Sequence, residues 1–235
     1  MKTIHEKKIE NNFSHYLDLA SHTPITTEQT IQKICAQVIE YDFNSSFMNP
    51  YYIVYARQFF KNHSPEKRKV GTVISFPLGQ ETAKIKMASA HEAAALGADE
   101  LDISLNVALI KEARWEKVLE EMSGLVQTAR AVNSNIIVKF IPETGYLTPV
   151  EIQKVAEIMV ESGADFFKTC SGMGPRGATL EDVYLVRDAI GHQIKIKVAG
   201  GISTYEQARA FIDAGADRIG TSKAVEIITE FKKLT

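Results

Sequence analysis

Several features that define common classes of protein are scarce or missing in this chain of 235 residues. Only two cysteines are present, Cys35 and Cys170, so we expect no disulfide framework and a reducing, cytoplasmic environment. A net charge of −2 gives no reason to expect nucleic acid or an anionic membrane as a partner. Residues 1–8 lack the apolar segment of a signal peptide, and no stretch approaches the roughly 18 apolar residues of a transmembrane helix.

The sequence signatures of common cofactor and metal sites are missing as well. No Gly-x-Gly-x-x-Gly follows a predicted strand into a helix, so a dinucleotide site is unsupported. No Ser-His-Asp or Cys-His arrangement stands out. The histidines show no metal-ligand spacing, and we expect each on a surface or in a loop: His5, His15, His22, His63, His91 and His192. The sequence therefore predicts neither a cofactor nor a metal.

What the chain does have is an alternation of short apolar segments and longer amphipathic ones. In 27–41, for example, Ile31, Ile34, Cys35, Val38 and Ile39 fall on one helical face, so Cys35 is expected in the core. A helix candidate follows each of eight predicted strands. These strands are 16–19, 46–48, 70–76, 100–105, 136–141, 166–169, 194–198 and 218–220.

Two kinds of signal mark the ends of the predicted helices. Capping boxes, in which a Ser or Thr and a Glu three residues on satisfy free amides reciprocally, occur at 148–151 and 203–206. Three near-identical junctions lead directly into strands, and we expect a left-handed backbone at the glycine of each. The junctions are Gly97-Ala98-Asp99, Gly163-Ala164-Asp165 and Gly215-Ala216-Asp217.

Alternating strands and helices predict a parallel sheet with right-handed crossovers. Eight such units in this length fit a closed (β/α)₈ barrel, and no linker or low-complexity segment divides the chain. We therefore predict a single catalytic domain over 1–235, with 1–14 as an N-terminal extension or helix. The first two strands are short and polar, and losing both would leave an open six-stranded, flavodoxin-like sheet.

In such a barrel the working groups lie at the carboxyl ends of the strands, and strand alternation indicates which side chains point inward. In 194–198 the apolar residues suit the helix-facing side, so Lys195 and Lys197 should face the interior. Lys197 is nearer the carboxyl end. Lys195 is expected to reach water near the opposite mouth.

The same alternation turns Glu100, Asp102 and Ser104 inward from the fourth predicted strand. Lys168 ends the sixth strand beside the seventh, and Lys139 lies within the fifth. The predicted interior thus holds at least four charged residues, which are Asp102, Lys139, Lys168 and Lys197.

Buried lysines of this kind have two interpretations. One is an ion network around Asp102 that merely fills the lumen, although burying ions rarely improves stability over apolar packing. The other is a nucleophilic amine. Two ammonium groups within about 4–6 Å disfavour each other's charge, so one lysine can be neutral near pH 7 and attack a carbonyl to form a Schiff base. Asp102 could then relay protons.

A second group of candidates follows the last three predicted strands. Gly200-Gly201 and Gly220-Thr221-Ser222-Lys223 lie after strands seven and eight, where barrel enzymes often hold a phosphate with backbone amides and a helix N-terminus. The loop 171–177 could close over a ligand. Arg176 in this loop is either a phosphate contact or solvated, and Cys170 is expected to line the site as a small side chain.

The chain resembles the deoxyribose-phosphate aldolase family, class I aldolases of the (β/α)₈ barrel fold. The similarity runs from about residue 16 to residue 228. The segments that carry it, in the family's order, are SFPLG at 75–79, DELD at 99–102, VKFIPET at 138–144, FKTCSG at 167–172, IKVAGG at 196–201 and RIGTS at 218–222.

The resemblance implies roles for the residues found above. Lys168 would be the Schiff-base lysine, Lys197 the neighbour that lowers its pKa, and Asp102 the proton-relay acid. The substrate phosphate would be held by Gly172, Gly200, Gly201 and Ser222. The implied reaction is reversible cleavage of 2-deoxyribose 5-phosphate to acetaldehyde and glyceraldehyde 3-phosphate, without a metal, by a chain that often forms homodimers in this family.

The chain also departs from the family. Ala20 replaces a threonine of the first strand, and Phe47 replaces a much smaller cysteine in the second. Cys170 stands where a serine is usual, and Arg176 and Lys223 add cations near the phosphate loops. Ala20 and Phe47 could reshape the acceptor pocket. A related class I aldolase with another sugar phosphate or donor is therefore one alternative, and a catalytically silent sugar-phosphate-binding barrel is another.

Overall fold

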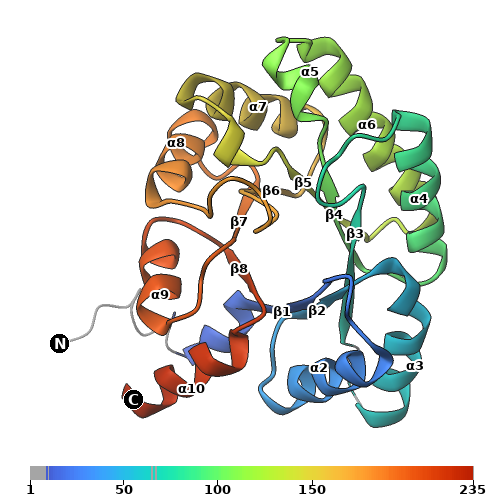
Figure 1. Cartoon of the computed structure of the whole chain (residues 1–235), viewed down its shortest axis with the longest axis vertical. Coiled ribbons are helices and arrows are strands. Elements are labelled where there is room, and N and C mark those ends of the chain that lie inside the picture. Colours follow the sequence, from blue (N-terminus) through green and yellow to red (C-terminus); the bar gives the residue numbers. More distant parts are fainter. Residues whose placement is uncertain (1–8, 10, 65, 67, 235) are drawn as a thin grey trace.

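The strands of this chain close into a ring, which helices surround (Figure 1). In the computed structural model, which describes residues 9, 11–64, 66 and 68–234, each of eight strands pairs in parallel with the next. The last strand then closes on the first. The predicted (β/α)₈ barrel is confirmed. The open six-stranded alternative is wrong, because the two short N-terminal strands do form and pair.

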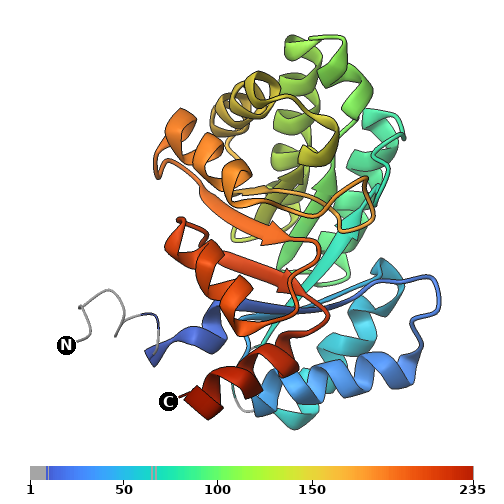
Figure 2. The same ribbon diagram turned by 60° about the vertical axis from the view of Figure 1, so that its left-hand side comes forward.

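All eight predicted strands are present, with ends shifted by one or two residues. Seen from the side, they run in one direction, so the loops that follow them gather at one end of the barrel (Figure 2). The strands are β1 (Leu17–Ser21), β2 (Ser45–Met48), β3 (Lys69–Ile74), β4 (Glu100–Ser104), β5 (Ile137–Ile141), β6 (Phe166–Lys168), β7 (Lys195–Ala199) and β8 (Arg218–Thr221).

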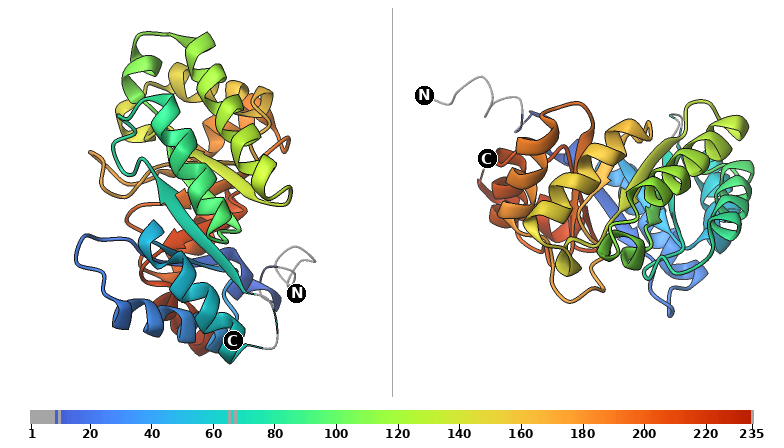
Figure 3. Two further views of the ribbon diagram at one scale, coloured as in Figure 1. Left: turned by 90° about the vertical axis from the view of Figure 1, so that its right-hand side faces the viewer. Right: turned by 90° about the horizontal axis from the view of Figure 1, so that it is seen from above.

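Helices form the outer layer, seen from two further directions in Figure 3. The α-helices are α2 (Glu28–Glu40), α3 (Ile53–His63), α4 (Ala83–Ala95), α5 (Val107–Lys111), α6 (Trp115–Val132), α7 (Pro149–Glu161), α8 (Leu180–Ile190), α9 (Tyr205–Asp213) and α10 (Ala224–Leu234). Short 3₁₀ helices are η1 (Phe13–Tyr16), η2 (Pro50–Tyr52) and η3 (Thr144–Tyr146). No helix of the described ranges is long and apolar enough to cross a membrane.

The apolar core lies between the strands and the helices. On α2, Ile31, Ile34, Cys35 and Val38 of the predicted face are buried and Ile39 is partly buried against the core, which confirms Cys35 as a core residue. Ile196 of β7 is likewise fully buried. Because burying an aliphatic side chain contributes about 1.5–3 kcal/mol, this outer shell supplies much of the barrel's stability. The lumen, in contrast, is filled largely by charged side chains.

The helix starts follow the predicted capping chemistry with one correction. Thr148 and Glu151 form the expected capping box at the start of α7. At α9 the predicted box is displaced by one residue, because Thr204 caps the helix together with Gln207. Gln207 also accepts the backbone N–H of Ser203 at 2.9 Å, which fixes the frame of this turn.

Three helix-to-strand junctions repeat one arrangement at the amino ends of the strands. Their glycines have φ angles of 101°, 80° and 110°, as expected of left-handed caps, at Gly97, Gly163 and Gly215. The aspartate two residues later accepts an N–H of the preceding strand at 2.8–2.9 Å, so it ties two strands together. Each aspartate also pairs with an arginine of a helix, namely Arg57 with Asp99, Arg130 with Asp165 and Arg187 with Asp217.

The N-terminal segment is only partly described. Residues 1–8 and 10, over which much of the predicted extension falls, lie outside the described residues. Ile9 and Phe13 are buried. The ring of Phe13 packs against those of Tyr205 and Phe231, with centroids 5.0 and 4.8 Å away.

Candidate active site

Two lysines from neighbouring strands project into the same mouth of the barrel. Lys168 of β6 and Lys197 of β7 are direct partners in the strand register. Because partners on adjacent parallel strands project to the same side, their side chains enter the lumen together. Both residues are almost fully buried, with exposed fractions of 3% and 1%. The inward orientation predicted from strand alternation is confirmed for both.

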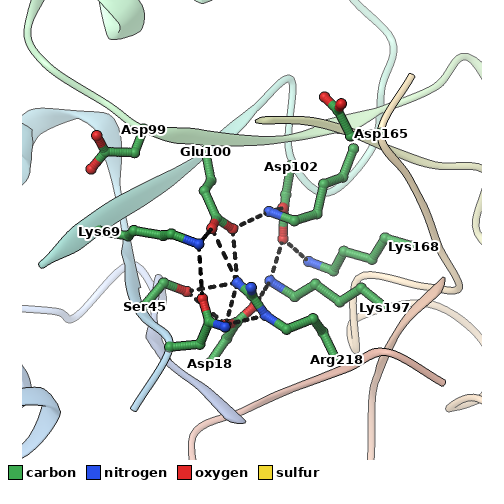
Figure 4. A network of polar contacts seen from close by, with 12 residues as sticks. Asp18, Ser45, Lys69, Asp99, Glu100, Asp102, Asp165, Lys168, Lys197 and Arg218 are labelled. Carbon is green, nitrogen blue, oxygen red and sulfur yellow. Dashed lines mark hydrogen bonds and ion pairs between the residues drawn. The ribbon is translucent and has the colours of Figure 1, made fainter. Parts of the chain in front are cut away.

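Asp102 of β4 is the carboxylate on which these lysines converge (Figure 4). Its Oδ2 lies 2.9 Å from the Nζ of Lys168 and 2.9 Å from the Nζ of Lys197. Its Oδ1 lies 3.1 Å from the Nζ of Lys139, which is the register partner of Asp102 on β5. Lys197 also contacts Asp18 of β1, with Nζ 2.8 Å from Oδ2. One carboxylate therefore serves three ammonium groups.

This crowding fixes the charge of Asp102. Burial would raise its pKa, but the positive charges of Lys139, Lys168 and Lys197 outweigh that effect and hold the pKa well below 3.8. Asp102 is therefore ionised at neutral pH. It can accept a proton only as part of a transfer that neutralises one of its cations.

The environment of Lys197, in contrast, favours the neutral form of its amine. Burial lowers its pKa to about 8 from the ordinary 10.5, because attraction by Asp102 and Asp18 only partly offsets the loss of water. Lys139 and Lys168 lower the pKa further by charge repulsion. An amine with a pKa near 8 can both give and take a proton close to neutral pH, as a catalytic acid or base must.

A cavity of about 430 Å³ opens above these side chains. The seven residues predicted for the site all line it, namely Asp102, Lys168, Gly172, Lys197, Gly200, Gly201 and Ser222. The structure thus brings together residues from β4, β6 and β7 and from the loops after β6, β7 and β8. Their roles remain predictions.

The glycine loops owe their course to backbone freedom that other residues lack. Gly172, Gly200 and Gly201 have φ angles of 83°, 94° and 81°, in the left-handed region that favours glycine. A Cβ on Gly200 would also lie 2.7 Å from the Sγ of Cys170. At Gly201 a Cβ would meet nothing within 4 Å, so only the backbone angle requires glycine there. Ser222 and Lys223 then lead into α10 beside these loops.

Of two predictions about residues at this end of the barrel, the one for Cys170 is wrong and the one for Arg176 stays a prediction. Arg176 is exposed, and its guanidinium also forms two hydrogen bonds of 2.7 and 2.8 Å to Asp182. Cys170 does not line the cavity. Its Sγ lies behind Gly200 and contacts the carbonyl oxygen of Ala199 at 2.7 Å. Strand β6 ends at Lys168, so the two-residue alternation does not extend to Cys170.

The opposite end of the lumen holds a second charged layer. The Nζ of Lys139 lies 2.5 Å from Glu100, and Arg218 of β8 lies 3.0 Å from Glu100 and 2.7 Å from Asp18. Although burial would raise the pKa of Glu100, Lys139 and Arg218 hold it below its ordinary value. A buried ion network around Glu100 and Asp18 therefore fills this end of the lumen, and the candidate active site lies above it. Lys195 is exposed near this end, as predicted.

Aromatic side chains shape the site in ways that the sequence only partly indicated. Phe47 and Ala20, the two departures from the family pattern, both line the cavity. The Nζ of Lys197 lies 3.4 Å from the centroid of the Phe47 ring, close enough for a cation–π contact. Gly71, the register partner of Phe47, provides room for this ring, because a Cβ there would lie 2.4 Å from it.

His22 is a cavity residue that sequence reasoning missed. It lies in a loop after β1, as expected, but it is half-buried and lines the cavity. Loop residues have no periodicity from which an inward orientation could be inferred. Among the residues that the structure describes, no group of three or more His, Cys, Asp or Glu could hold a metal ion.

Comparison with known proteins agrees with this geometry. A family model described as DeoC/LacD family aldolase matches residues 15–225. Deoxyribose-phosphate aldolase from Caldanaerobacter subterraneus subsp. tengcongensis is 40% identical over 229 residues, covering 96% of this chain and 97% of that protein. The enzyme of the same name from Thermococcus kodakarensis is 40% identical over 219 residues, covering 93% of this chain and 96% of the relative.

Solved structures give the same result. The aldolase QR15 superposes with a TM-score of 0.85 at 38% identity, covering 94% of this chain and 96% of that chain. Deoxyribose phosphate aldolase from Aeropyrum pernix, described as a unique tetrameric structure, superposes with a TM-score of 0.87 at 28% identity. That match covers 96% of this chain and 93% of the other.

Proposed function

Since this chain belongs to the DeoC/LacD family of aldolases, we propose that it is a class I aldolase acting on 2-deoxyribose 5-phosphate. The reaction would be reversible cleavage to glyceraldehyde 3-phosphate and acetaldehyde. One observation carries this proposal above all. The amines of Lys168 and Lys197 share a single oxygen of Asp102 at 2.9 Å, at the floor of a cavity that glycine loops border.

Lys168 is the better candidate for the covalent bond. Lys197 has two carboxylate partners, Asp102 and Asp18, and its ammonium also lies on the Phe47 ring. For Lys168 one ion pair is observed, with Asp102, and its Nζ lies 5.5 Å from the centroid of the Phe76 ring. The amine with fewer contacts has less to break when it attacks a carbonyl. Lys197 is then suited to exchange protons beside it.

The steps of the reaction can be assigned to these groups. The neutral amine of Lys168 attacks C1 of the open-chain sugar, and loss of water gives an iminium ion. A base removes the proton of the C3 hydroxyl, the C2–C3 bond breaks, and its electrons pass into the C–N system as an enamine. Protonation of C2 and hydrolysis then release acetaldehyde and the free lysine. Lys197, with its pKa of about 8, and Asp102 are suited to carry these protons.

The phosphate would bind at the loops after β6, β7 and β8. Gly172, Gly200 and Gly201 permit close approach of backbone amides, and Ser222 adds a hydroxyl near the start of α10. Lys223 also lines the cavity, although its Nζ pairs with Glu226 at 2.9 Å. This arrangement supports a substrate with an aldehyde at one end and a phosphate at the other.

Borohydride trapping tests the covalent step. Reduction in the presence of 2-deoxyribose 5-phosphate should add a stable adduct, and mass spectrometry of peptides should locate it at Lys168. The Lys168→Met variant should lose the adduct. Lys195→Met is the matched control, because Lys195 belongs to β7 but is exposed near the opposite end of the barrel. An adduct at another lysine, or none with folded protein, would contradict the proposal.

A related class I aldolase with a different substrate is the second candidate. The observation that favours it is the position of Ala20 and Phe47, which line the same cavity as Lys168 and can alter the space for the acceptor. Measuring kcat/KM over a panel of donors and sugar phosphates would decide, because specificity is a ratio of such values. A binding barrel without turnover would fail on every member of the panel.

We further propose that 1–235 acts as one catalytic domain in the cytoplasm and assembles as a homo-oligomer. The sequence resemblance favours a dimer, whereas the relative from Aeropyrum pernix is described as tetrameric. Light scattering on the purified chain would distinguish two copies from four. A monomer at working concentration would contradict the oligomer.

A further inference from the structure

His22 lines the cavity, but the proposed reaction assigns it no role. Its ring packs edge-on against Phe76, with centroids 4.7 Å apart and planes at 86°. The Nζ of Lys168 lies 5.5 Å from the centroid of the same Phe76 ring. The imidazole and the candidate nucleophile thus lie against one aromatic side chain. Both residues also line the cavity into which a carbon chain attached to Lys168 would extend.

One nitrogen of the His22 ring, the buried Nδ1, has no hydrogen-bond partner among the residues that the structure describes. A buried polar atom left without a hydrogen bond costs about 1–3 kcal/mol. Such an atom calls for an explanation, which at a ligand cavity is a polar group of the ligand or a water molecule.

The charge state of His22 limits which group of a bound ligand its imidazole can bind. Burial lowers its pKa to about 4, and the positive charge of Lys168 contributes to the same shift. The ring is therefore neutral at pH 7, with one nitrogen as donor and the other as acceptor. A neutral imidazole suits a hydroxyl group, whereas the phosphate has the amides of the glycine loops.

We propose that His22 determines specificity by hydrogen-bonding the C4 hydroxyl of the bound sugar phosphate. In the three-carbon acceptor this is the hydroxyl next to the aldehyde. The inference rests on the proposed function, which assigns C1 to Lys168, the C3 oxygen to the proton exchange of Asp102 and Lys197, and the phosphate to the glycine loops. The C4 hydroxyl is the remaining polar group of the sugar phosphate, and it would face the wall of the cavity. Ala20 and Phe47 on that wall offer no side-chain hydrogen bond.

The test compares two acceptors with acetaldehyde as donor. One is D-glyceraldehyde 3-phosphate, and the other is the same phosphorylated aldehyde without the hydroxyl. The measured quantity is the ratio of their kcat/KM values. His22→Leu should lower this ratio by about tenfold to a hundredfold, mainly by slowing the hydroxylated acceptor, because its hydroxyl would lose its partner.

Two further variants indicate which nitrogen is used. His22→Asn keeps a polar atom near the position of Nδ1, and His22→Gln keeps one near Nε2. The variant that preserves the wild-type ratio identifies the nitrogen. If His22→Leu does not fold, a ratio preserved in one of these two variants and lowered in the other still supports the assignment. His91→Leu is the matched control, because His91 is an exposed histidine of α4, and its ratio should not change.

The opposing outcomes are distinct. An unchanged ratio in His22→Leu, or equal loss with both acceptors, would show that His22 acts on structure alone. Equal ratios in the Asn and Gln variants, both unlike wild type, would likewise contradict a hydrogen bond from one ring nitrogen. If the wild type gives neither turnover nor a borohydride adduct, the proposed function itself fails. A wild type that is active while His22→Leu keeps the ratio would overturn only the present inference.

Discussion

The two ends of the barrel lumen both contain buried charges, but the charges are matched differently. At the amino end, Glu100 and Asp18 face Lys139 and Arg218, so the buried charges of opposite sign are equal in number, while the half-exposed Lys69 adds a contact to Glu100. At the carboxyl end, Asp102 is shared among Lys139, Lys168 and Lys197, and of these Lys197 has a further contact with Asp18 and Lys139 with Glu100. In the balanced layer the neighbouring opposite charges outweigh the effect of burial, so they lower the pKa of Glu100 and raise the pKa values of Lys139 and Arg218. The unbalanced layer holds an amine that loses its proton near pH 8.

This contrast separates two uses of buried ions. A matched network gives little net stability over apolar packing, but removing one member is costly because it leaves a charge unpaired. A buried charge without a matching partner is already unfavourable in the native protein. Its pKa therefore moves toward neutral pH, which makes proton transfer easier. Four substitutions or conditions can test whether the two layers really differ in this way.

The largest effect is expected at Asp102. Asp102→Asn removes the carboxylate that the crowded layer shares, and Lys168 then loses the one carboxylate observed to contact it. We expect turnover to fall by on the order of 10²–10⁴-fold, and the free energy of unfolding to fall by about 3–5 kcal/mol. Steady-state kinetics and urea denaturation measure the two losses. Activity near that of the wild type would show that the shared carboxylate has no part in the chemistry.

Glu100→Gln should affect the other layer in a different manner. It leaves Arg218 with only Asp18 and Lys139 with only Asp102 among the observed carboxylates, so we expect a loss of about 3 kcal/mol in the free energy of unfolding. Turnover of the protein that remains folded should stay within a few-fold of wild type. A loss of kcat as large as that of Asp102→Asn would show that the two layers act as one.

The pH dependence of stability should report Lys197. Its pKa is about 8 in the folded protein and 10.5 in an unfolded chain, so below pH 8 it is protonated in both states and its burial is unfavourable. Between these values the unfolded chain binds more protons, and the free energy of unfolding should rise with pH by on the order of 3 kcal/mol. Lys197→Met should lack this rise. Equal slopes in both proteins between pH 8 and 10 would contradict the lowered pKa.

The smallest effect is expected at Phe47. The cation–π contact with Lys197 favours the charged amine by about 0.5–2 kcal/mol, so its removal in Phe47→Leu should lower the pKa of Lys197 further. The inflection in the pH profile of kcat/KM should shift to lower pH by about 0.4–1.5 units. A shift to higher pH would indicate that water entering beside the smaller side chain outweighs the lost contact.

The sequence predicted the parts of the site that lie on regular strands. The two-residue alternation along a strand predicts that the side chains of Lys168, Lys197 and Asp102 point inward. The order of the strands along the chain predicts that they lie near one another, and both patterns can be read from the sequence. Arg218 also lies on a strand, but its partner Glu100 is far away in sequence, and only closure of the barrel brings them together. Long-range pairing of this kind leaves no local pattern.

The errors and omissions occurred where regular structure ends. Cys170 was assigned by alternation two residues beyond Lys168, where β6 has already stopped. Arg176 lies in a loop whose course lets it reach Asp182, and no propensity rule indicates such a pair. His22 lies in another loop, so neither its burial nor its orientation was visible. Capping chemistry predicted the helix start at Thr148 but was one residue off at Thr204.

The three Gly-Ala-Asp junctions at the amino ends of the strands have a consequence for how this enzyme can change. Asp165 stands directly before β6, and its side chain fixes that strand against β5, while Asp217 fixes β8 against β7. A slip of one residue there would turn Lys168 or Lys197 toward the helices. The positions of the reactive amines along the barrel axis are thus fixed by residues at the amino ends of the strands. Loops at the catalytic end can lengthen, shorten or be exchanged for new ones, and substrate range can drift, while the amines stay where they are.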